Sequence, residues 1–233
     1  MAENECKKCD KDGFRWEQRK VEGYNYLLDF AVKCECGKNE RLKFNSKLQK
    51  SGIGENFKQK SFDNYITPVP ELQKIKKVCI DYATNFSKMQ FEKRNGILIC
   101  GRVGSGKTHL ATATAIANRI MMSAIQVEYF QYREKITKIK QVINDKDEYE
   151  KLMRCKKIKV LFIDDLFKGK ITDSDVNIIY EIVNYRYQTK LPMIITSELS
   201  LVEILQIDEA IGSRIAEMCN IVKIGAENHR LRG

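Results

Sequence analysis

The sequence predicts an α/β domain with a parallel sheet flanked by helices, preceded by a small module that a metal ion holds together. Apolar runs at 97–100, 160–163 and within 191–198 have the length and composition of buried parallel strands, and helix-forming sequence lies between them. Two closely spaced cysteine pairs stand near the start of the chain. A chain of 233 residues is long enough for one main domain and one small appendage.

The composition is that of a protein without membrane helices, and it is compatible with more than one kind of partner. Lysine and arginine number 41 against 31 acidic residues, and the net charge of +10 favours a polyanionic partner, although a mildly basic solvated surface is the other interpretation. No stretch approaches the roughly 18 consecutive apolar residues of a membrane helix, and the first residues lack the apolar region of a signal peptide. We therefore expect a soluble, cytoplasmic protein with no membrane partner.

Four of the eight cysteines form a metal-ligand pattern, the pair Cys6 and Cys9 and the pair Cys34 and Cys36. Four thiolates suit a closed tetrahedral zinc site, and the metal would replace the hydrophobic core that so short a module cannot build. Chance cysteines or a redox pair are the alternatives. The other cysteines stand singly in apolar or mixed segments, where we expect them to pack: Cys79, Cys100, Cys155 and Cys219.

The domain boundaries follow from changes in composition. We expect a zinc-binding module over 1–45, a polar linker over 46–60 and the main domain over 61–233. A short basic helix after Cys36 should end at Ser51 and Gly52. Beyond Pro68 and Pro70, helical spacing predicts a helix with one apolar face, formed by Leu72, Ile75, Val78, Cys79 and Tyr82.

The strand at 97–100 runs directly into the stretch GRVGSGKT, which has the spacing G-x-x-x-x-G-K-[ST]. Its glycines allow backbone N–H groups to surround phosphate oxygens, and the helix that follows adds the positive end of its dipole. Lys107 would reach the outer phosphates and the Thr108 hydroxyl would bind Mg²⁺. The residues expected to bind the nucleotide here are Gly101, Arg102, Val103, Gly104, Ser105, Gly106, Lys107, Thr108 and His109.

A second strand, within KVLFIDDL, ends in two acids. Asp164 is placed to bind the Mg²⁺ opposite Thr108, and Asp165 to orient or deprotonate the attacking water. Many ATPases of this kind use the longer glutamate for that role, so we expect slow hydrolysis. The alternative is that the two acids only cap the next helix.

Two further groups of polar residues follow along the chain. The strand within LPMIITSE ends in Thr196, Ser197 and Glu198 at the carboxyl edge of the sheet, where open parallel sheets bind ligands, and one of these side chains should sense the γ-phosphate. Arg214 lies on a later helix, and Arg230 and Arg232 lie near the end of the sequence. This order of motifs is that of a ring-type ATPase in which an arginine of one subunit completes the site of its neighbour.

These segments, together with SFDNY, IGSRI and GAENHR, resemble the DnaC/DnaI-type helicase loaders along essentially the whole chain. The resemblance implies an AAA+ ATPase that delivers a hexameric replicative DNA helicase onto single-stranded DNA, with the cysteine module binding the helicase. It implies that Lys107 and Thr108 hold ATP and Mg²⁺, and that Asp164 and Asp165 are the Walker B acids. It also assigns Arg214 as a finger acting in trans and Arg230 as the sensor-2 arginine, and places Asn64 and Tyr65 near the adenine.

The sequence departs from that family pattern at two places. Glu198 stands where relatives commonly have asparagine, which bears on the assignment of the γ-phosphate sensor. No sequence remains after residue 233 for the helical lid of many AAA+ proteins, which matches these loaders. We therefore expect neighbouring subunits to close the open side of the nucleotide site through self-association at Arg214.

The segment 131–159 is the candidate surface for single-stranded DNA. Basic residues recur in it at helical spacing near three aromatic residues, which could stack on bases; an ordinary charged helix face is the alternative. The basic residues are Arg133, Lys135, Lys138 and Lys140, and the aromatic residues are Tyr129, Phe130 and Tyr132.

The sequence as a whole predicts an ATP-dependent helicase loader of replication initiation or restart. An IstB-like transposition helper shares the same core but is expected to lack paired cysteines, so bound zinc would favour the loader. A nucleotide-gated adaptor that does not hydrolyse ATP is a third possibility.

Overall fold

The computed structural model describes residues 6–23, 25–54, 57, 59–121 and 125–225. Contacts divide the chain into two compact units, Met1–Gln49 and Lys50–Gly233. The helix α1, Lys38–Lys50, extends past residue 45, where the sequence places the end of the first module. It ends directly before Ser51 and Gly52, as expected.

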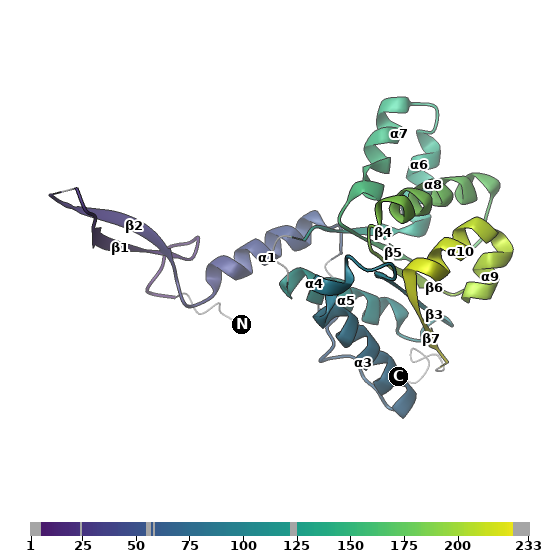
Figure 1. The fold of residues 1–233 in the computed structure, drawn as a ribbon, viewed down its shortest axis with the longest axis horizontal. Helices are drawn as coiled ribbons and strands as arrows, with labels where there is room; N and C mark the ends of the chain where they lie inside the picture. Colours follow the sequence, from purple (N-terminus) through teal and green to yellow (C-terminus); the bar gives the residue numbers. More distant parts are fainter. Residues whose placement is uncertain (1–5, 24, 55–56, 58, 122–124, 226–233) are drawn as a thin grey trace. The chain divides into compact units, whose positions relative to one another are not determined.

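The first unit contains a two-stranded antiparallel hairpin and the helix α1 (Figure 1). Strand β1, Phe14–Lys20, pairs with β2, Leu27–Lys33. The hairpin leaves large side chains exposed, and Trp16 is 67% exposed. Among the described residues before Lys50, the buried ones are Gly13, Cys34 and Asn39. This unit therefore lacks a hydrophobic core of its own within its described part.

The second unit is a parallel five-stranded sheet with strand order β4-β5-β6-β3-β7. In chain order its strands are β3 (Gly96–Gly101), β4 (Val127–Gln131), β5 (Val160–Asp164), β6 (Met193–Ser197) and β7 (Cys219–Ile224). The helices described with both bounds in this unit are α3 (Pro70–Thr84), α4 (Phe86–Met89), α5 (Lys107–Met121), α6 (Tyr132–Gln141), α7 (Lys146–Met153), α8 (Asp173–Thr189), α9 (Leu201–Ile207) and α10 (Glu209–Met218), with a 3₁₀ turn at Arg154–Lys157. The α/β fold predicted from the sequence is confirmed.

Helices cover both faces of the sheet, with α3 and α5 on one face and α8, α9 and α10 on the other (Figure 1). Alternation along the strands accounts for this, because successive side chains point to opposite faces. Leu98, Leu161 and Ile163 join one buried cluster with α8–α10. The strands are buried on both faces, which explains why they appear in the sequence as continuous apolar runs.

Helix α3 has the predicted apolar face, with one exception. Leu72, Ile75, Cys79 and Tyr82 are buried, whereas Val78 is 43% exposed. Val78 lies at the edge of the apolar face, so helical spacing alone wrongly predicted that its side chain is buried. The four singly spaced cysteines are all buried, as expected of packing residues.

Neither a membrane-spanning helix nor a lid helix is found among the described residues. Within them, none of the helices has the length and apolar character that crossing a membrane requires. No lid helix follows β7 within the described part, which ends at Gly225.

Candidate functional site

The phosphate loop connects the buried strand β3 to helix α5, which begins at Lys107. Gly104 and Gly106 have φ of 74° and 92°, values that favour glycine. A Cβ atom on Gly106 would also lie 2.8 Å from Cε2 of Tyr65, so that position excludes larger residues on two grounds. The loop thus directs backbone N–H groups and the first turn of α5 toward one cleft.

Lys107 is buried at the floor of this cleft. Its Nζ donates to the carbonyl oxygen of Arg102 at 2.9 Å. Burial lowers the pKa of Lys107, and the nearby carboxylates of Asp165 and Glu198 oppose that shift. The ammonium is therefore partly desolvated in a position where a phosphate oxygen would stabilise its charge.

Asp164 accepts hydrogen bonds from three hydroxyl groups. The donors are Thr108 Oγ1 at 3.0 Å, Thr196 Oγ1 at 2.6 Å and the Tyr129 hydroxyl at 2.8 Å. Thr108 and Asp164 thus present the two kinds of oxygen that Mg²⁺ uses beside phosphates. The residues present therefore fit Mg²⁺ at this point, between α5 and the end of β5.

The backbone after Asp164 is held in an uncommon conformation. Asp165 has φ of 56° and Phe167 has φ of 61°. The Asp165 N–H donates to Thr196 Oγ1 at 2.8 Å, and Phe167 is buried in the main cluster. These contacts hold the Asp165 carboxylate at the cleft against the cost of a left-handed conformation.

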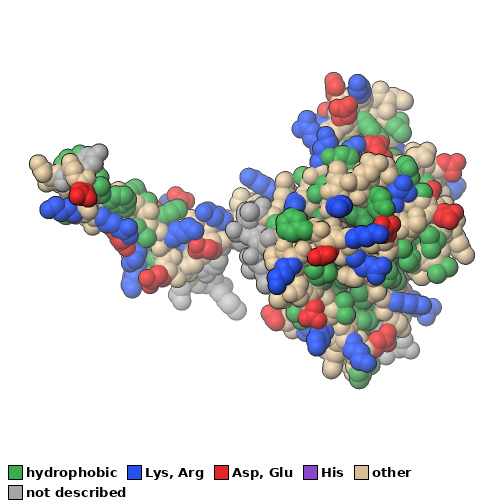
Figure 2. All heavy atoms as spheres, in the orientation of Figure 1, with side chains coloured by type: hydrophobic (Ala, Val, Ile, Leu, Met, Phe, Trp, Pro, Cys, Tyr) green, Lys and Arg blue, Asp and Glu red, His purple; other side chains and the backbone are tan. Residues whose placement is uncertain are grey.

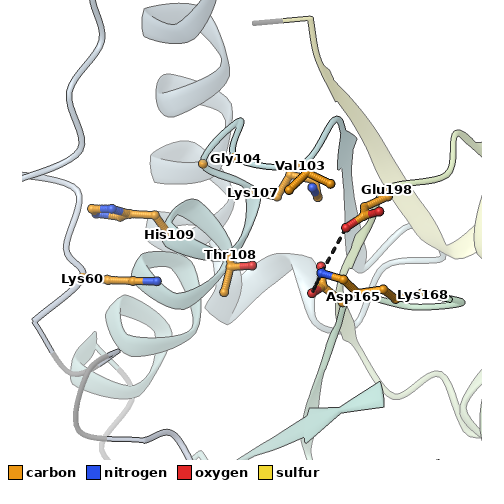
Figure 3. A pocket seen from close by; sticks show the side chains of 10 residues that line it. Lys60, Val103, Gly104, Lys107, Thr108, His109, Asp165, Lys168 and Glu198 are labelled. Atoms are coloured by element: carbon orange, nitrogen blue, oxygen red, sulfur yellow. Dashed lines mark hydrogen bonds and ion pairs between the residues drawn. The ribbon is translucent and has the colours of Figure 1, made fainter. Parts of the chain in front are cut away.

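Lys168 joins the acids of two neighbouring strands (Figure 3). Its Nζ lies 2.7 Å from Asp165 Oδ2 and 3.0 Å from Glu198 Oε1. Burial disfavours its charge, but the hydrogen bonds to the two carboxylates prevail and raise the pKa of Lys168. The three side chains line the same cleft as Lys107 and Thr108.

The segment at 61–65 packs against the first turn of α5. His109 Nε2 lies 2.9 Å from the Ser61 carbonyl oxygen and 3.0 Å from Asn64 Oδ1. The ring of Tyr65 meets the His109 ring edge-on with 5.2 Å between centroids. The residues assigned to the adenine side, Asn64 and Tyr65, therefore contact the nucleotide-binding helix through His109.

The four clustered cysteines lie together in the first unit. All four Sγ atoms lie within 4.8 Å of one another, with 3.8 Å between Cys6 and Cys34 and 3.6 Å between Cys9 and Cys36. Zn–S bonds of about 2.3 Å in a tetrahedron place sulfur atoms about 3.8 Å apart. The cluster therefore has the dimensions of a four-thiolate zinc site.

The turns around this cluster are tightly fixed. Asp10 Oδ1 accepts from the N–H groups of Asp12 and Phe14, and the Cys34 N–H donates to the Gly13 carbonyl. Gly13 has φ of 80°, and a Cβ there would lie 2.4 Å from the Asn39 nitrogen. Side-chain and backbone hydrogen bonds thus position the ligating loops.

The structure corrects the expectation of base stacking at the basic helix. Tyr129, Phe130 and Tyr132 are buried in the domain, in β4 and at the start of α6, so their rings are not available to stack on bases. The basic side chains of the helix are already engaged: Lys138 with Glu134, Lys140 with Asp175, Lys135 with Glu128, and Arg133 with the Lys170 carbonyl. Figure 2 shows acidic and basic side chains interspersed on the face it presents.

The geometry of a phosphate loop beside a threonine and aspartate pair is that of an ATP-binding domain. The family of IstB-like ATP binding proteins matches residues 16–233. The chain belongs to this family.

Two relatives of this IstB-like chain come from Bacillus subtilis strain 168. The uncharacterised protein YqaM is 40% identical over 215 residues, which cover 87% of this chain and 67% of YqaM. The phage-like element PBSX protein XkdC is 36% identical over 245 residues, which cover 98% of this chain and 87% of XkdC. The crystal structure of the DnaC helicase loader has a TM-score of 0.66 at 24% identity, covering 73% of this chain and 99% of that chain. The predicted AAA+ fold and the resemblance to DnaC/DnaI-type proteins are confirmed.

The structure of the IstB-like chain brings eight of the predicted site residues to the lining of one cleft: Val103, Gly104, Gly106, Lys107, Thr108, His109, Asp165 and Glu198. Ser197 and Arg214 are among those that do not line it. Ser197 is buried, and its hydroxyl donates to the Leu166 carbonyl at 2.8 Å. Arg214 lies on α10 against Tyr180 and Tyr187 of α8, and its Nε donates to Asn184 Oδ1 at 3.1 Å. Arg230 and Arg232 lie outside the described residues.

Three residues of the IstB-like site have roles that sequence reasoning missed. Thr196 bridges Asp164 and Asp165, Tyr129 donates to Asp164, and Lys168 pairs two acids. The signal for Thr196 was its place near the carboxyl end of an apolar strand; that β5 lies beside this strand is known only from the structure. Tyr129 gave no such signal, because aromatic residues in strands usually only pack.

Proposed function

We propose that this protein is an ATP-dependent loader that delivers a hexameric replicative DNA helicase onto single-stranded DNA. The single observation that carries the proposal is the presence, in one chain, of a four-thiolate module and an ATP-binding domain of the DnaC fold. The first unit supplies a surface for the helicase, and the second supplies a nucleotide-dependent change of assembly. A protein with this role at replicating DNA would work in the cytoplasm.

The chemistry proposed for the site is hydrolysis of ATP. Lys107 and the loop amides hold the phosphates, and Thr108 and Asp164 hold Mg²⁺, which neutralises charge on the phosphates when bound. Asp165 orients or deprotonates the attacking water. Its side chain is shorter than the glutamate of many such ATPases, and one of its oxygens is engaged by Lys168 at 2.7 Å, so fewer positions remain for the attacking water; both features support slow turnover.

A transposition helper is the second candidate, because the matched family is named for IstB. The similarity to XkdC of a phage-like element also fits a mobile genetic context. The cysteine cluster favours the loader, because zinc in the first module is not expected of the transposition helpers. A non-hydrolysing adaptor remains the third candidate and differs from both in having no turnover.

The experiment that tests the proposal is binding of the purified full chain to a purified hexameric replicative helicase, with ADP or a non-hydrolysable ATP analogue. We expect a complex that forms with the analogue, and helicase transfer to single-stranded DNA on addition of ATP. Cys34→Ser should lose the complex, whereas Cys155→Ala, a change at a packing cysteine, should keep it. Binding to an IS21-type transposase in place of the helicase would establish the second candidate.

A further inference from the structure

We infer that Lys168 is the side chain by which the cleft distinguishes ATP from ADP, through its ammonium group. The inference rests on the proposed ATP site and concerns a residue outside the phosphate loop. Lys168 lines the cleft that contains Lys107 and Thr108, on the loop that follows β5 (Figure 3).

The backbone of this loop is fixed, while the Lys168 side chain remains accessible. Leu166 N–H donates to the Thr196 carbonyl at 2.8 Å, and Phe167 is buried. On the far side of Lys168, Arg133 donates to the Lys170 carbonyl at 3.0 Å. The Lys168 side chain itself is 43% exposed. The loop therefore presents one cation at a defined place with room to change partners.

The charges in the cleft explain why a cation is needed at this wall. Asp165 and Glu198 directly follow two neighbouring strands, β5 and β6, and carboxylates accept hydrogen bonds but cannot donate them. Without Lys168 they would repel a polyphosphate. Lys168 offsets this repulsion and is the hydrogen-bond donor that these three side chains can offer to a terminal phosphate.

The ammonium group of Lys168 can donate a hydrogen bond to a third acceptor. An ammonium group has three N–H donors, and the described residues give that of Lys168 two carboxylate partners, Asp165 and Glu198. One donor thus remains for an oxygen from the cleft. ADP lacks the γ-phosphate that would provide this oxygen, so the contact would favour ATP.

The test measures binding of a non-hydrolysable ATP analogue and of ADP to the full chain with Mg²⁺ by calorimetry. Lys168→Met should weaken analogue binding about tenfold and ADP binding by less than about threefold. Lys168→Arg should retain most of the preference. Lys170→Met removes the same charge two positions away and should leave both affinities unchanged; thermal melting checks that each variant is folded.

A double-mutant background separates direct contact from simple neutralisation of the acids. In Asp165→Asn/Glu198→Gln the repulsion is removed, and addition of Lys168→Met should still reduce the ATP-over-ADP preference about tenfold. An unchanged preference in that background would overturn the inference and leave the ATP site intact. Wild-type protein that binds neither nucleotide would overturn the proposed function as well.

Discussion

At the scale of single residues, Asp164 is the centre of the site, because hydroxyl groups from a helix and two strands converge on its carboxylate. Burial, followed by the charge of Asp164, raises the pKa of Tyr129, so its hydroxyl remains a donor at any physiological pH. The three donors fix both carboxylate oxygens. Asp164 is therefore held in one position by its own chain, which would reduce the cost of ordering the proposed metal site.

Replacement of Lys107 and of the acids should impair the site at different steps. Lys107→Ala removes the buried cation and should weaken nucleotide binding at least about tenfold. Asp164→Asn or Asp165→Asn should leave appreciable binding, because the loop amides remain, and should reduce turnover about 100-fold. Calorimetry measures the binding and phosphate release measures the turnover. Equal hydrolysis by wild type and Asp165→Asn would show that another group activates the water.

At the scale of elements, Arg186 secures α8 to the chain that enters the sheet. Its guanidinium is fully buried and donates to four backbone carbonyls, those of Lys156, Ile158, Lys159 and Pro192. These carbonyls precede β5 and β6, so one side chain fixes the start of two neighbouring strands. The carboxyl ends of those strands carry Asp164 and Thr196.

Loss of this side chain should destabilise the second unit. Arg186→Met leaves several buried carbonyls without donors, and we expect a loss of about 3 kcal/mol or more in the free energy of unfolding. Arg154→Met, at an exposed position nearby, should change it by less than about 0.5 kcal/mol. Urea denaturation measures both. A small effect at Arg186 would mean that water satisfies the carbonyls in its place.

The cysteine module gives a prediction about metal content. The full chain should contain about one zinc ion, and Cys34→Ser should release it and unfold the hairpin, since the described part of this unit has no apolar core. ATP affinity should stay unchanged, because the second unit has its own core. Metal analysis and calorimetry provide the two measurements. Purified protein without zinc would contradict the assignment.

The sequence predicted the strands and the phosphate loop better than it predicted the contacts between them. Periodicity and the phosphate loop were sufficient for the parallel sheet, the cleft and Asp164. Strand order and register were not accessible, since side-chain spacing along one strand does not say which strand lies beside it. Ile163 pairs with Ile195, which places Thr196 beside Asp164. Ser197 follows Thr196 directly, and successive strand residues face opposite sides, so Ser197 lies on the other side from Thr196.

At the scale of the whole molecule, the proposed trans role of Arg214 depends on assembly. Within its own chain the guanidinium lies over two tyrosine rings, with 5.3 Å to the centroid of the Tyr180 ring. It also donates to Asn184 Oδ1 at 3.1 Å and to the Ala210 carbonyl at 2.9 Å. A guanidinium binds a phosphate more strongly than it binds rings and neutral acceptors, so a phosphate of a neighbouring subunit could replace these contacts. Arg214 as a finger stays a prediction.

Mixing of two inactive variants tests this assignment. Turnover per subunit should rise with protein concentration, and Arg214→Ala should bind ATP normally but hydrolyse it at least about 100-fold more slowly. A mixture with Lys107→Ala should recover part of the activity, because an intact site of one variant can receive the arginine of the other. Unaltered turnover in Arg214→Ala, or an inactive mixture, would rule out a finger acting in trans.

Tyr129 also links Asp164 to the stretch of chain that follows α1. Its hydroxyl binds Asp164, while its backbone N–H donates to the Ser51 carbonyl at 2.7 Å and its ring contacts Phe57. The chain just after α1 is thus attached to Tyr129, whose hydroxyl group hydrogen-bonds Asp164, the proposed magnesium ligand. If the chain carries a helicase as proposed, tension on the stretch after α1 would reach the Asp164 carboxylate through Tyr129, and nucleotide turnover would depend on load.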